Sequence, residues 1–439
     1  MDRSGDTLPA RYLPIGLLRY HSFYLDRFPI LFDQQARKKY SGGRKPYYLQ
    51  LHFGHYVSSY TPGPALLAVP VYAVPVLAGM STDSRWLPQL EKFSASVITA
   101  FSVVFLFWAL REVVSEIGAL AITVIYAFGT SSFSVSSQAL WQHGPSQFFV
   151  ALALYFLVKG IQREHYLPYA GFSLAAAVVM RPTDALLALP IGLWIIHEHR
   201  KVLVRFILFA LPPLVLILIY NRVYLSSTVG SPFASDPVAW TMPMSRGLPG
   251  LLFSPARGLF IYSPIFIFSL WGMYLGWRSG SWFLRYLSLG PVLVVLLYSK
   301  WFMWWGGYSY GPRLLADITP VLCFFLYPVC QQIQGRRILI GAFIVLGLLS
   351  IGLHTIDVYW NDGNWEAIQD IDNHPERLWN WRNSPIVYCG KPAYWDAGAI
   401  YHYLMHRWLP PKPKSHDQPP RTIQLTPLQL YFEEPVTRG

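Results

Sequence analysis

The sequence predicts an all-α protein, a polytopic bundle of membrane-spanning helices. Hydrophobic residues make up 53% of the 439 residues and charged residues only 13%, whereas soluble domains carry roughly 25% charged residues. Mean hydropathy is +0.31, and apolar residues gather in runs close to the ~20 residues that a helix needs to cross the hydrocarbon core. This composition excludes a disordered chain, a coiled coil and a typical cytosolic enzyme.

The chain divides into three regions. Residues 1–93 form an outer-face first loop, residues 94–354 form the transmembrane bundle, and residues 355–439 form an outer-face tail that is polar, aromatic and rich in proline. We expect this tail to be ordered at first and loose from about Pro410 onward. We predict about ten spans within the bundle, near residues 94–111, 115–135, 145–160, 166–181, 184–199, 203–222, 258–277, 283–299, 313–331 and 337–354.

Residues 62–80 are apolar enough to insert into a membrane but contain four prolines. Each proline inside a helix removes a backbone hydrogen bond and kinks the helix, and such a backbone survives in lipid only where protein covers it. We therefore predict a juxtamembrane or re-entrant helix on the outer side. If this run spanned the membrane instead, residues 1–61 would be cytoplasmic and the catalytic hypothesis below would fail.

Basic residues predict the orientation, because they concentrate in cytoplasmic loops. The net charge of +12 is explained in this way and does not indicate a nucleic-acid partner. Basic residues occupy alternate loops, at Arg111, at Lys159 and Arg163, at Arg200, Lys201 and Arg205, at Arg278 and Arg285, and at Arg336 and Arg337. With ten spans, both termini then lie outside. Residues 1–61 hold no signal peptide or span, so we expect that one upstream helix is missing through a mis-assigned start or a fragment.

The first loop holds the acidic residues best placed for chemistry. Asp6 and Asp26 lie close to the N-terminus, with Arg11, His55 and Tyr60 in the same loop. A carboxylate at the mouth of the bundle is suited to act as a general base toward a hydroxyl. The alternative is that Asp6 caps the following turn or is simply solvated.

His143, at the outer end of a span, is a second candidate. It could bind a phosphate, donate a proton or hold a metal. The alternative is an interfacial histidine, beside Trp141, that bonds to a backbone carbonyl. The chain lacks HExxH and CxxC spacings, so it shows no strong metal signature. Three cysteines, Cys323, Cys330 and Cys389, exclude a disulfide scaffold and offer no obvious pair.

Three arginines lie at span mouths on the outer side, where basic residues are scarce. They are Arg181, Arg257 and Arg313, and a guanidinium matches the oxygens of a phosphate bidentately. The alternative is local pairing, of Arg181 with Asp184 and of Arg313 with Asp317, whereas Arg257 has no nearby acid in the sequence.

Aromatic residues are abundant, with 17 Trp, 28 Tyr and 27 Phe. Most fit aromatic belts at the membrane interface; Trp301, Trp304 and Trp305 are best explained in this way, although stacking against a sugar or an isoprenoid is open to them. The chain contains no Gly-rich phosphate loop, nucleophile elbow or Rossmann fingerprint, so it gives no sign of binding ATP or a nucleotide sugar.

Several sequence blocks resemble those of a known superfamily. The blocks are PGPALLAVPVY, WQHG, the RP of RPTD, SPARGLFIYSP, WWGGYSYGPR and IDNHPERLWNWR. They are similar to blocks in bacterial membrane proteins of the GT-C glycosyltransferase superfamily, which includes protein O-mannosyltransferases and the aminoarabinose transferase acting on lipid A. The similarity runs from about residue 3 to about residue 390.

This resemblance implies a membrane glycosyltransferase in the bacterial inner membrane. Such enzymes move a sugar from a polyprenyl-phosphate donor to an acceptor hydroxyl on the outer, periplasmic face, usually with inversion. Asp6 falls where the superfamily has its first-loop catalytic acid, Asp26 is the second candidate, and Arg11, His55, Tyr60, His143, Arg181, Arg257 and Arg313 are candidate substrate or phosphate contacts. No cofactor is certain, and a divalent metal stays open because relatives differ.

Two other functions remain open at this point. Arginines at span mouths and a proline-broken helix also suit a transporter or flippase of lipid-linked or anionic substrates. The third alternative is an inactive, truncated relative. The sequence does not name the sugar, the acceptor (lipid, glycan or protein) or the oligomeric state.

Overall fold

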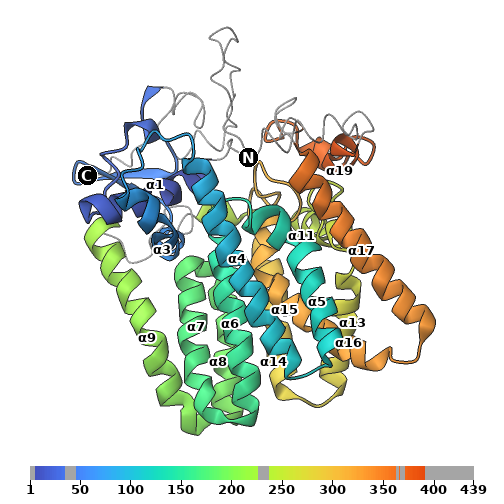
Figure 1. Ribbon diagram of the computed structural model, residues 1–439. Coiled ribbons are helices and arrows are strands. Elements are labelled where there is room, and N and C mark those ends of the chain that lie inside the picture. Colours follow the sequence, from blue (N-terminus) through green and yellow to red (C-terminus); the bar gives the residue numbers. More distant parts are fainter. Residues whose placement is uncertain (1–4, 35–45, 226–236, 362–364, 366–370, 391–439) are drawn as a thin grey trace.

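The computed structural model describes residues 5–34, 46–225, 237–361, 365 and 371–390. In this part of the chain the protein is almost entirely helical and has one small two-stranded sheet, so the all-α prediction is confirmed. The helices stand side by side as a bundle, with a smaller cap at one end (Figure 1). The expected loosening of the tail from about Pro410 falls outside the described residues.

Each of the ten predicted spans contains helix. The helices are α4 (Leu87–Arg111), α5 (Glu116–Phe128), α6 (His143–Gln162), α7 (Leu167–Met180), α8 (Ala185–Glu198), α9 (Leu203–Tyr220), α13 (Phe266–Arg278), α14 (Trp282–Tyr298), the consecutive α15 (Thr319–Phe324) and α16 (Leu326–Gln332), and α17 (Arg337–Trp360). Among the described residues, five stretches are long and apolar enough to cross a membrane: Leu87–Arg111, His143–Gln162, Arg200–Leu225, Arg313–Gln332 and Arg337–Trp360. The protein is therefore a multi-pass membrane protein.

Besides the span divided into α15 and α16, two more of the predicted spans are not continuous α-helices, for local reasons. The run 258–277 splits into α12 (Leu259–Tyr262) and α13, because a residue that precedes proline, here Ser263 before Pro264, disfavours helical geometry. The run 115–135 ends as α-helix at Phe128 and continues as a π-helical turn, Ser132–Ser136. Side-chain hydroxyl groups in this stretch donate to nearby backbone carbonyls and compete with the backbone hydrogen bonds of a regular α-helix.

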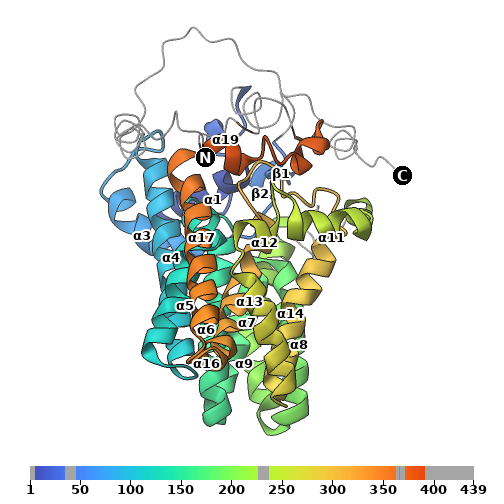
Figure 2. The same ribbon diagram turned by 90° about the vertical axis from the view of Figure 1, so that its right-hand side faces the viewer.

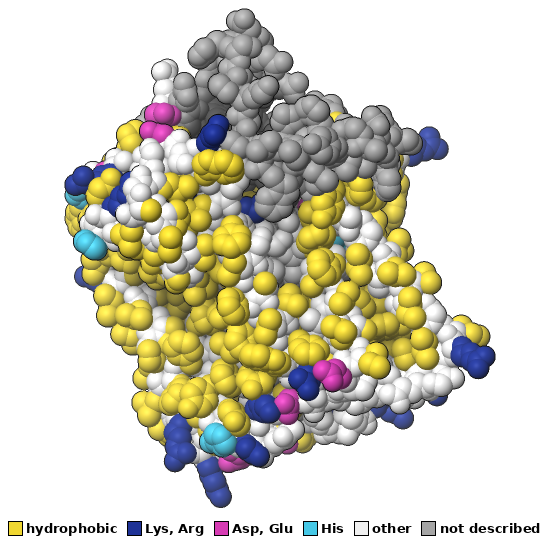
Figure 3. All heavy atoms as spheres, viewed as in Figure 1, with side chains coloured by type: hydrophobic (Ala, Val, Ile, Leu, Met, Phe, Trp, Pro, Cys, Tyr) yellow, Lys and Arg dark blue, Asp and Glu magenta, His cyan; other side chains and the backbone are white. Residues whose placement is uncertain are grey.

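The two ends of the bundle carry different chemistry. The five connections with basic residues, α4–α5, α6–α7, α8–α9, α13–α14 and α16–α17, all lie at the lower end in both ribbon views (Figures 1 and 2). The space-filling view shows a broad apolar surface over the helices and Lys and Arg side chains along that lower edge (Figure 3). This arrangement is the asymmetry that the positive-inside rule expects of a membrane bundle.

The cap at the upper end is built from the N-terminal part of the chain. It contains α1 (Leu8–Tyr20), the hairpin of β1 (Leu49–His52) and β2 (His55–Ser58), and α3 (Gly63–Leu77). The strands pair antiparallel from Leu49 with Ser58 to His52 with His55. The connecting residues Phe53 and Gly54 both have positive φ, as the tightest hairpin turn requires.

Helix α3 is the run for which we expected a juxtamembrane or re-entrant helix. It contains Pro70 and Pro75 and lies in the cap, beside α1 and the upper part of α4 (Figures 1 and 2). Its C-terminal carbonyls find a partner outside the helix, because Arg19 donates to the carbonyls of Val76 and Met80. The hairpin residues 46–61 lie at the same end of the bundle as α3, and the basic connections lie at the opposite end (Figures 1 and 2).

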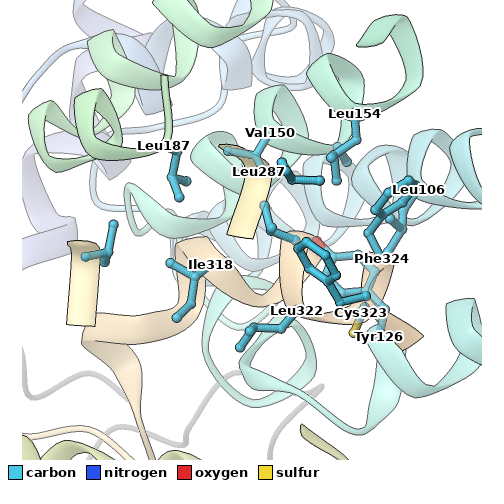
Figure 4. Packing of buried hydrophobic residues seen from close by; sticks show 14 of the residues in the cluster. Leu106, Tyr126, Val150, Leu154, Leu187, Leu287, Ile318, Leu322, Cys323 and Phe324 are labelled. Atoms are coloured by element: carbon cyan, nitrogen blue, oxygen red, sulfur yellow. The ribbon is translucent and has the colours of Figure 1, made fainter. Parts of the chain in front are cut away.

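The main core lies between the helices and surrounds α15. Figure 4 shows side chains that converge there from α4, α5, α6, α8, α14 and α15, among them Leu106, Tyr126, Leu154 and Phe324. In the 18-residue apolar window of Arg313–Gln332, 72% is buried in the protein, whereas in that of Arg200–Leu225 only 17% is buried. The 3-10 helix Arg313–Ile318 (η9) that leads into α15 is thus a central element, and its first residues emerge at the upper end of the bundle.

We predict that Gly272 is required for helix packing. A Cβ atom at this position of α13 would lie 1.7 Å from the carbonyl oxygen of Phe325, which cannot move without displacing the α15–α16 backbone. Gly272→Ala should therefore destabilise the protein by about 1–3 kcal/mol and lower the midpoint of thermal unfolding in detergent. Gly352→Ala, on an open face of α17, is the control and should leave the midpoint unchanged or slightly higher. Equal midpoints for the two variants would contradict the packing.

Candidate functional site

Asp6 lies at the upper end of the bundle with three partners around its carboxylate. The Arg313 guanidinium donates to Oδ2 at 2.9 Å, and the hydroxyls of Tyr47 and Tyr60 donate to Oδ1 at 2.8 and 2.9 Å. The Asp6 and Arg313 side chains keep 18% and 13% of their surface exposed. The pair is therefore enclosed but reachable from outside.

Local structure explains how the two tyrosines reach Asp6. Tyr47 precedes strand β1 and Tyr60 follows strand β2, so the two ends of the hairpin deliver both hydroxyls to one place. The Tyr47 hydroxyl also accepts from the backbone N–H of Gly5 at 3.1 Å. Gly5 itself leaves no room for a side chain, because a Cβ atom there would lie 2.2 Å from the ring of Tyr48. The turn that carries Asp6 is thus packed against the hairpin.

The electrostatic surroundings keep Asp6 ionised. Burial alone would raise the pKa of the Asp6 carboxyl, but the Arg313 guanidinium and the hydrogen bonds from Tyr47, Arg313 and Tyr60 outweigh burial, and the pKa lies below its ordinary value. Burial and the charge of Asp6 raise the pKa of the Tyr60 hydroxyl well above its ordinary value. Tyr60 is therefore a hydrogen-bond donor to the carboxylate and stays protonated.

Arg313 is positioned from several sides. Its guanidinium carbon lies 4.4 Å from the ring centre of Trp141, a cation–π contact. Gly306 and Gly307 both have positive φ, and a Cβ atom at Gly307 would lie 3.8 Å from a terminal nitrogen of Arg313. The double glycine lets the 304–312 loop turn next to the guanidinium, which a larger residue at this φ would not do without strain.

A second ion-pair cluster lies deeper, at the upper ends of four helical segments. Arg181, which directly follows α7, places Nε 2.6 Å from Oδ2 of Asp317 in η9. His143, the first residue of α6, lies between these groups, with Nδ1 2.9 Å from Asp317 and Nε2 3.0 Å from Arg181. Arg181 also donates to the hydroxyl of Tyr298, the last residue of α14.

The hydrogen bonds of this cluster assign the form of His143. A guanidinium only donates, so Nε2 must accept from Arg181 and Nδ1 must carry the proton that bonds to Asp317. Both nitrogens are thereby occupied by protein groups. His143 lies between Arg181 and Asp317, so the alternative of a histidine bonded to a backbone carbonyl does not describe it.

The structure pairs the arginines with acids far away in sequence. We considered Arg181 with Asp184 and Arg313 with Asp317 as local pairs, but Arg181 pairs with Asp317 and Arg313 pairs with Asp6. Asp184 accepts from Ser146 at 2.6 Å instead. The helix ends turn toward a common centre, so contacts between segments replace the contacts within a segment. The alternatives for Asp6, a turn cap or a solvated side chain, do not describe its position either.

Arg257 is fully enclosed and supports the loop beside Arg313. Its guanidinium donates to the carbonyls of Trp305, Ala256 and Gly307, and the residue is 1% exposed. The sequence predicts a substrate contact for Arg257. In the structure its guanidinium instead supports the backbone of the loop next to Arg313, at Trp305 and Gly307.

The remaining candidates of the first loop, Asp26, His55 and Arg11, lie away from Asp6 and Arg313. Asp26 accepts from His55 at 2.9 Å and from the backbone N–H of Tyr56 at 2.7 Å, in a half-exposed pair on the hairpin side of the cap. Arg11 forms a buried ion pair with Glu91 at 2.6 Å, and Glu91 also accepts from the backbone N–H of Leu140. Arg11 thus joins α1 to α4, and Tyr60 alone among these residues of the first loop reaches Asp6.

The site also includes residues that sequence reasoning did not place in it. Tyr47, Trp141, Asp317 and Tyr298 contact the two ion pairs. Tyr47 and Tyr60 flank the hairpin symmetrically, which is a signal that the sequence contains. No group of three or more His, Cys, Asp or Glu side chains suited to a metal ion occurs among the described residues, and the three cysteines are free thiols.

Comparison with known proteins gives one match. A family model described as dolichyl-phosphate-mannose-protein mannosyltransferase matches residues 92–224, just under a third of the chain. No curated protein and no solved structure matches. The matched segment begins in α4 and ends after α9, so it includes His143 and Arg181 but neither Asp6 nor Arg313.

The match and the architecture agree with each other. The matched helices belong to an all-α, multi-pass bundle whose Asp6–Arg313 and Arg181–Asp317 ion pairs lie at the end opposite the basic connections. Together these findings support similarity to a membrane glycosyltransferase of the GT-C type.

Proposed function

We propose that this protein transfers a sugar from a polyprenyl-phosphate donor to an acceptor hydroxyl, with inversion at the anomeric carbon. The observation that carries the proposal is the Asp6–Arg313 pair, a carboxylate and a guanidinium 2.9 Å apart at the mouth of the bundle. Sugar transfer from a phosphate needs one group that accepts a proton and one that stabilises the departing phosphate. This pair offers both in one place.

Charge asymmetry supports the side of the membrane on which the reaction takes place. The basic connections lie at the lower end of the bundle and the Asp6–Arg313 pair at the upper end (Figure 1). Because basic loops face the cytoplasm, Asp6 faces the opposite compartment. We propose the inner membrane of a bacterium, with the site toward the periplasm.

The reaction itself is a single displacement. The acceptor oxygen bonds to the anomeric carbon while the bond from that carbon to the phosphate oxygen breaks. The proton of the acceptor hydroxyl passes to the Asp6 carboxylate, and polyprenyl phosphate departs with the bonding electron pair. One displacement at one carbon inverts its configuration.

Arg313 links the two halves of this reaction. In the structure its guanidinium lowers the pKa of Asp6, which also makes the carboxylate a weaker base. A donor phosphate near Arg313 shares that guanidinium, because arginine binds phosphate and carboxylate through the same fork of donors. The basicity of Asp6 then rises when the donor is bound. Arg181 adds positive charge from the deeper cluster without leaving Asp317.

A transporter or flippase is the alternative function. Transporters place ligand sites near the midplane, at interrupted helices. Here the Asp6–Arg313 pair and the Arg181–Asp317 pair both lie toward one end of the bundle. This placement favours chemistry at a surface over passage through the bundle.

We predict that Asp6→Asn abolishes transfer while the protein still inserts and folds. The amide keeps the shape of the side chain but loses the charge that accepts the proton, so the rate should fall by roughly 10²–10⁴-fold. The assay measures release of polyprenyl phosphate from a panel of polyprenyl-phosphate hexoses, with the full chain in proteoliposomes and envelope extract as acceptor.

Asp26→Asn is the matched control for this experiment. Asp26 is the other acid of the first loop, and it bonds to His55 rather than to an arginine. It should keep most of the wild-type rate. Wild-type turnover by Asp6→Asn, or loss of turnover by Asp26→Asn alone, would remove Asp6 from the role of base.

We predict that Arg313 sets the acid limb of the pH profile. Activity depends on ionised Asp6, so kcat/KM is lost as the pH falls through its pKa, which in the wild type lies below the ordinary value of an aspartate. Arg313→Gln removes the charge that lowers the pKa of Asp6 and leaves the burial that raises it. The acid limb should therefore move to higher pH, and kcat/KM should fall at every pH.

Two further variants test the cause of that shift. Arg313→Lys keeps the positive charge, so the acid limb of the kcat/KM profile should stay close to its wild-type pH. Tyr60→Phe removes one hydrogen bond to Asp6 and should move the limb upward by less than Arg313→Gln does. An acid limb that is unchanged in Arg313→Gln would show that another group titrates.

A further inference from the structure

A cavity of about 550 Å³ lies beside the candidate site. It is open to the surface and is bordered by helix α11 (Met244–Phe253), the loop that carries Trp304 and Trp305, and the segment 372–379 that follows α17. Its volume falls in the range of small-molecule sites, roughly 300–1,000 Å³. Both α11 and the segment after α17 lie at the upper end of the bundle (Figures 1 and 2).

The wall of this cavity combines aromatic rings with charged groups. Trp304, Trp305 and Trp379 contribute indole rings, and Asp372 and Arg246 contribute a carboxylate and a guanidinium. A pyranose ring presents an apolar face of C–H groups and a rim of hydroxyls. Indole rings suit the face, and charged hydrogen-bonding groups suit the rim.

The wall is rigidly built. The indole N–H of Trp305 donates to Oδ1 of Asp372 at 3.0 Å, which orients the carboxylate. Trp304 packs so closely on α11 that a Cβ atom at Gly250 would lie 2.6 Å from its ring. Trp379 lies 6.4 Å from Trp304, measured between ring centres. Such preorganised side chains lose little conformational entropy when a ligand binds.

The cavity reaches toward the Asp6–Arg313 pair along one loop. Met303 lines the cavity, and Gly307 lies between Met303 and Arg313, since a Cβ there would be 3.6 Å from the Met303 sulfur and 3.8 Å from an Arg313 nitrogen. Arg257 holds this loop through the carbonyls of Trp305 and Gly307. One loop thus forms a wall of the cavity and a side of the Arg313 site.

We propose that this cavity binds a sugar ring of the acceptor, so that the acceptor is a saccharide or glycoconjugate. This inference rests on the proposed function, because it assigns the second substrate of the same site. A sugar is favoured over the isoprenoid chain because Asp372 and Arg246 lie on the wall and an isoprenoid offers no partner to either. The position above the helices also suits a ligand that arrives from water.

The test is ligand-observed saturation-transfer NMR on the full chain in nanodiscs. The probes are the methyl glycosides of mannose, glucose and galactose, the disaccharide maltose, and farnesyl phosphate as a short isoprenoid phosphate. At least one saccharide should bind the wild type. Trp379→Ala should weaken that binding by about two- to tenfold, the range of an aromatic contact, and Asp372→Asn should weaken it as well.

Trp381→Ala is the matched control. Trp381 is an exposed tryptophan, at 59%, two residues from Trp379, which is 44% exposed, and it does not line the cavity. It should bind saccharides as the wild type does, because its ring lies outside the cavity wall. The assay measures binding and requires no sugar transfer. The binding assay therefore stands even if the transfer hypothesis fails.

Three results would overturn the inference. The first is that none of the saccharides binds the wild type. The second is that Trp379→Ala and Trp381→Ala bind saccharides equally well. The third is that farnesyl phosphate is the probe whose binding depends on Trp379, which would make the cavity an isoprenoid-phosphate site. Wild-type transfer by Asp6→Asn would count against the proposed function alone.

Discussion

The ion pair of Asp6 and Arg313 is the interaction on which the candidate site depends. It joins residues 307 positions apart, one in the first turn of the cap and one at the start of the central segment. A charge in such an enclosed position is tolerated only with a partner, because desolvation of a lone carboxylate or guanidinium is costly. Each residue therefore requires the other, and the cap is held over the mouth of the bundle. The two tyrosines, Trp141 and the double glycine all position this pair.

A second layer supports the first. Arg181, Asp317, His143 and Tyr298 are more deeply buried than the outer pair, and their hydrogen bonds link the ends of α6, α7, α14 and η9. Arg257 supports the loop that passes between the outer pair and the aromatic cavity. The outer pair is more exposed than the deeper cluster. A substrate can therefore reach the outer pair, whereas the deeper cluster supports the helix ends beneath it. Asp6 and Arg313 belong to the reachable layer.

The sequence predicted the helical architecture well, because apolar runs and basic loops are local signals. The ten segments, the grouping of basic connections at one end and the helix at 63–77 could all be read from composition and spacing. Asp6, Tyr60 and Arg313 are candidates for one site from the sequence, and in the structure Tyr60 and Arg313 both bond to Asp6. Their partners could not be predicted, because spacing reveals only pairs three or four residues apart, such as Arg313 with Asp317. The sequence favours Arg257 as a ligand contact because no acid is near it in the chain, yet its guanidinium bonds to backbone carbonyls, which no residue pattern identifies.

The most direct test of this account is an experimental structure of the full chain with a short polyprenyl phosphate bound. The phosphate should lie within hydrogen-bonding distance of Arg313, with the Asp6 carboxylate beside it and the sugar position facing the aromatic cavity. A phosphate bound elsewhere, with the Asp6–Arg313 pair still intact, would contradict the account.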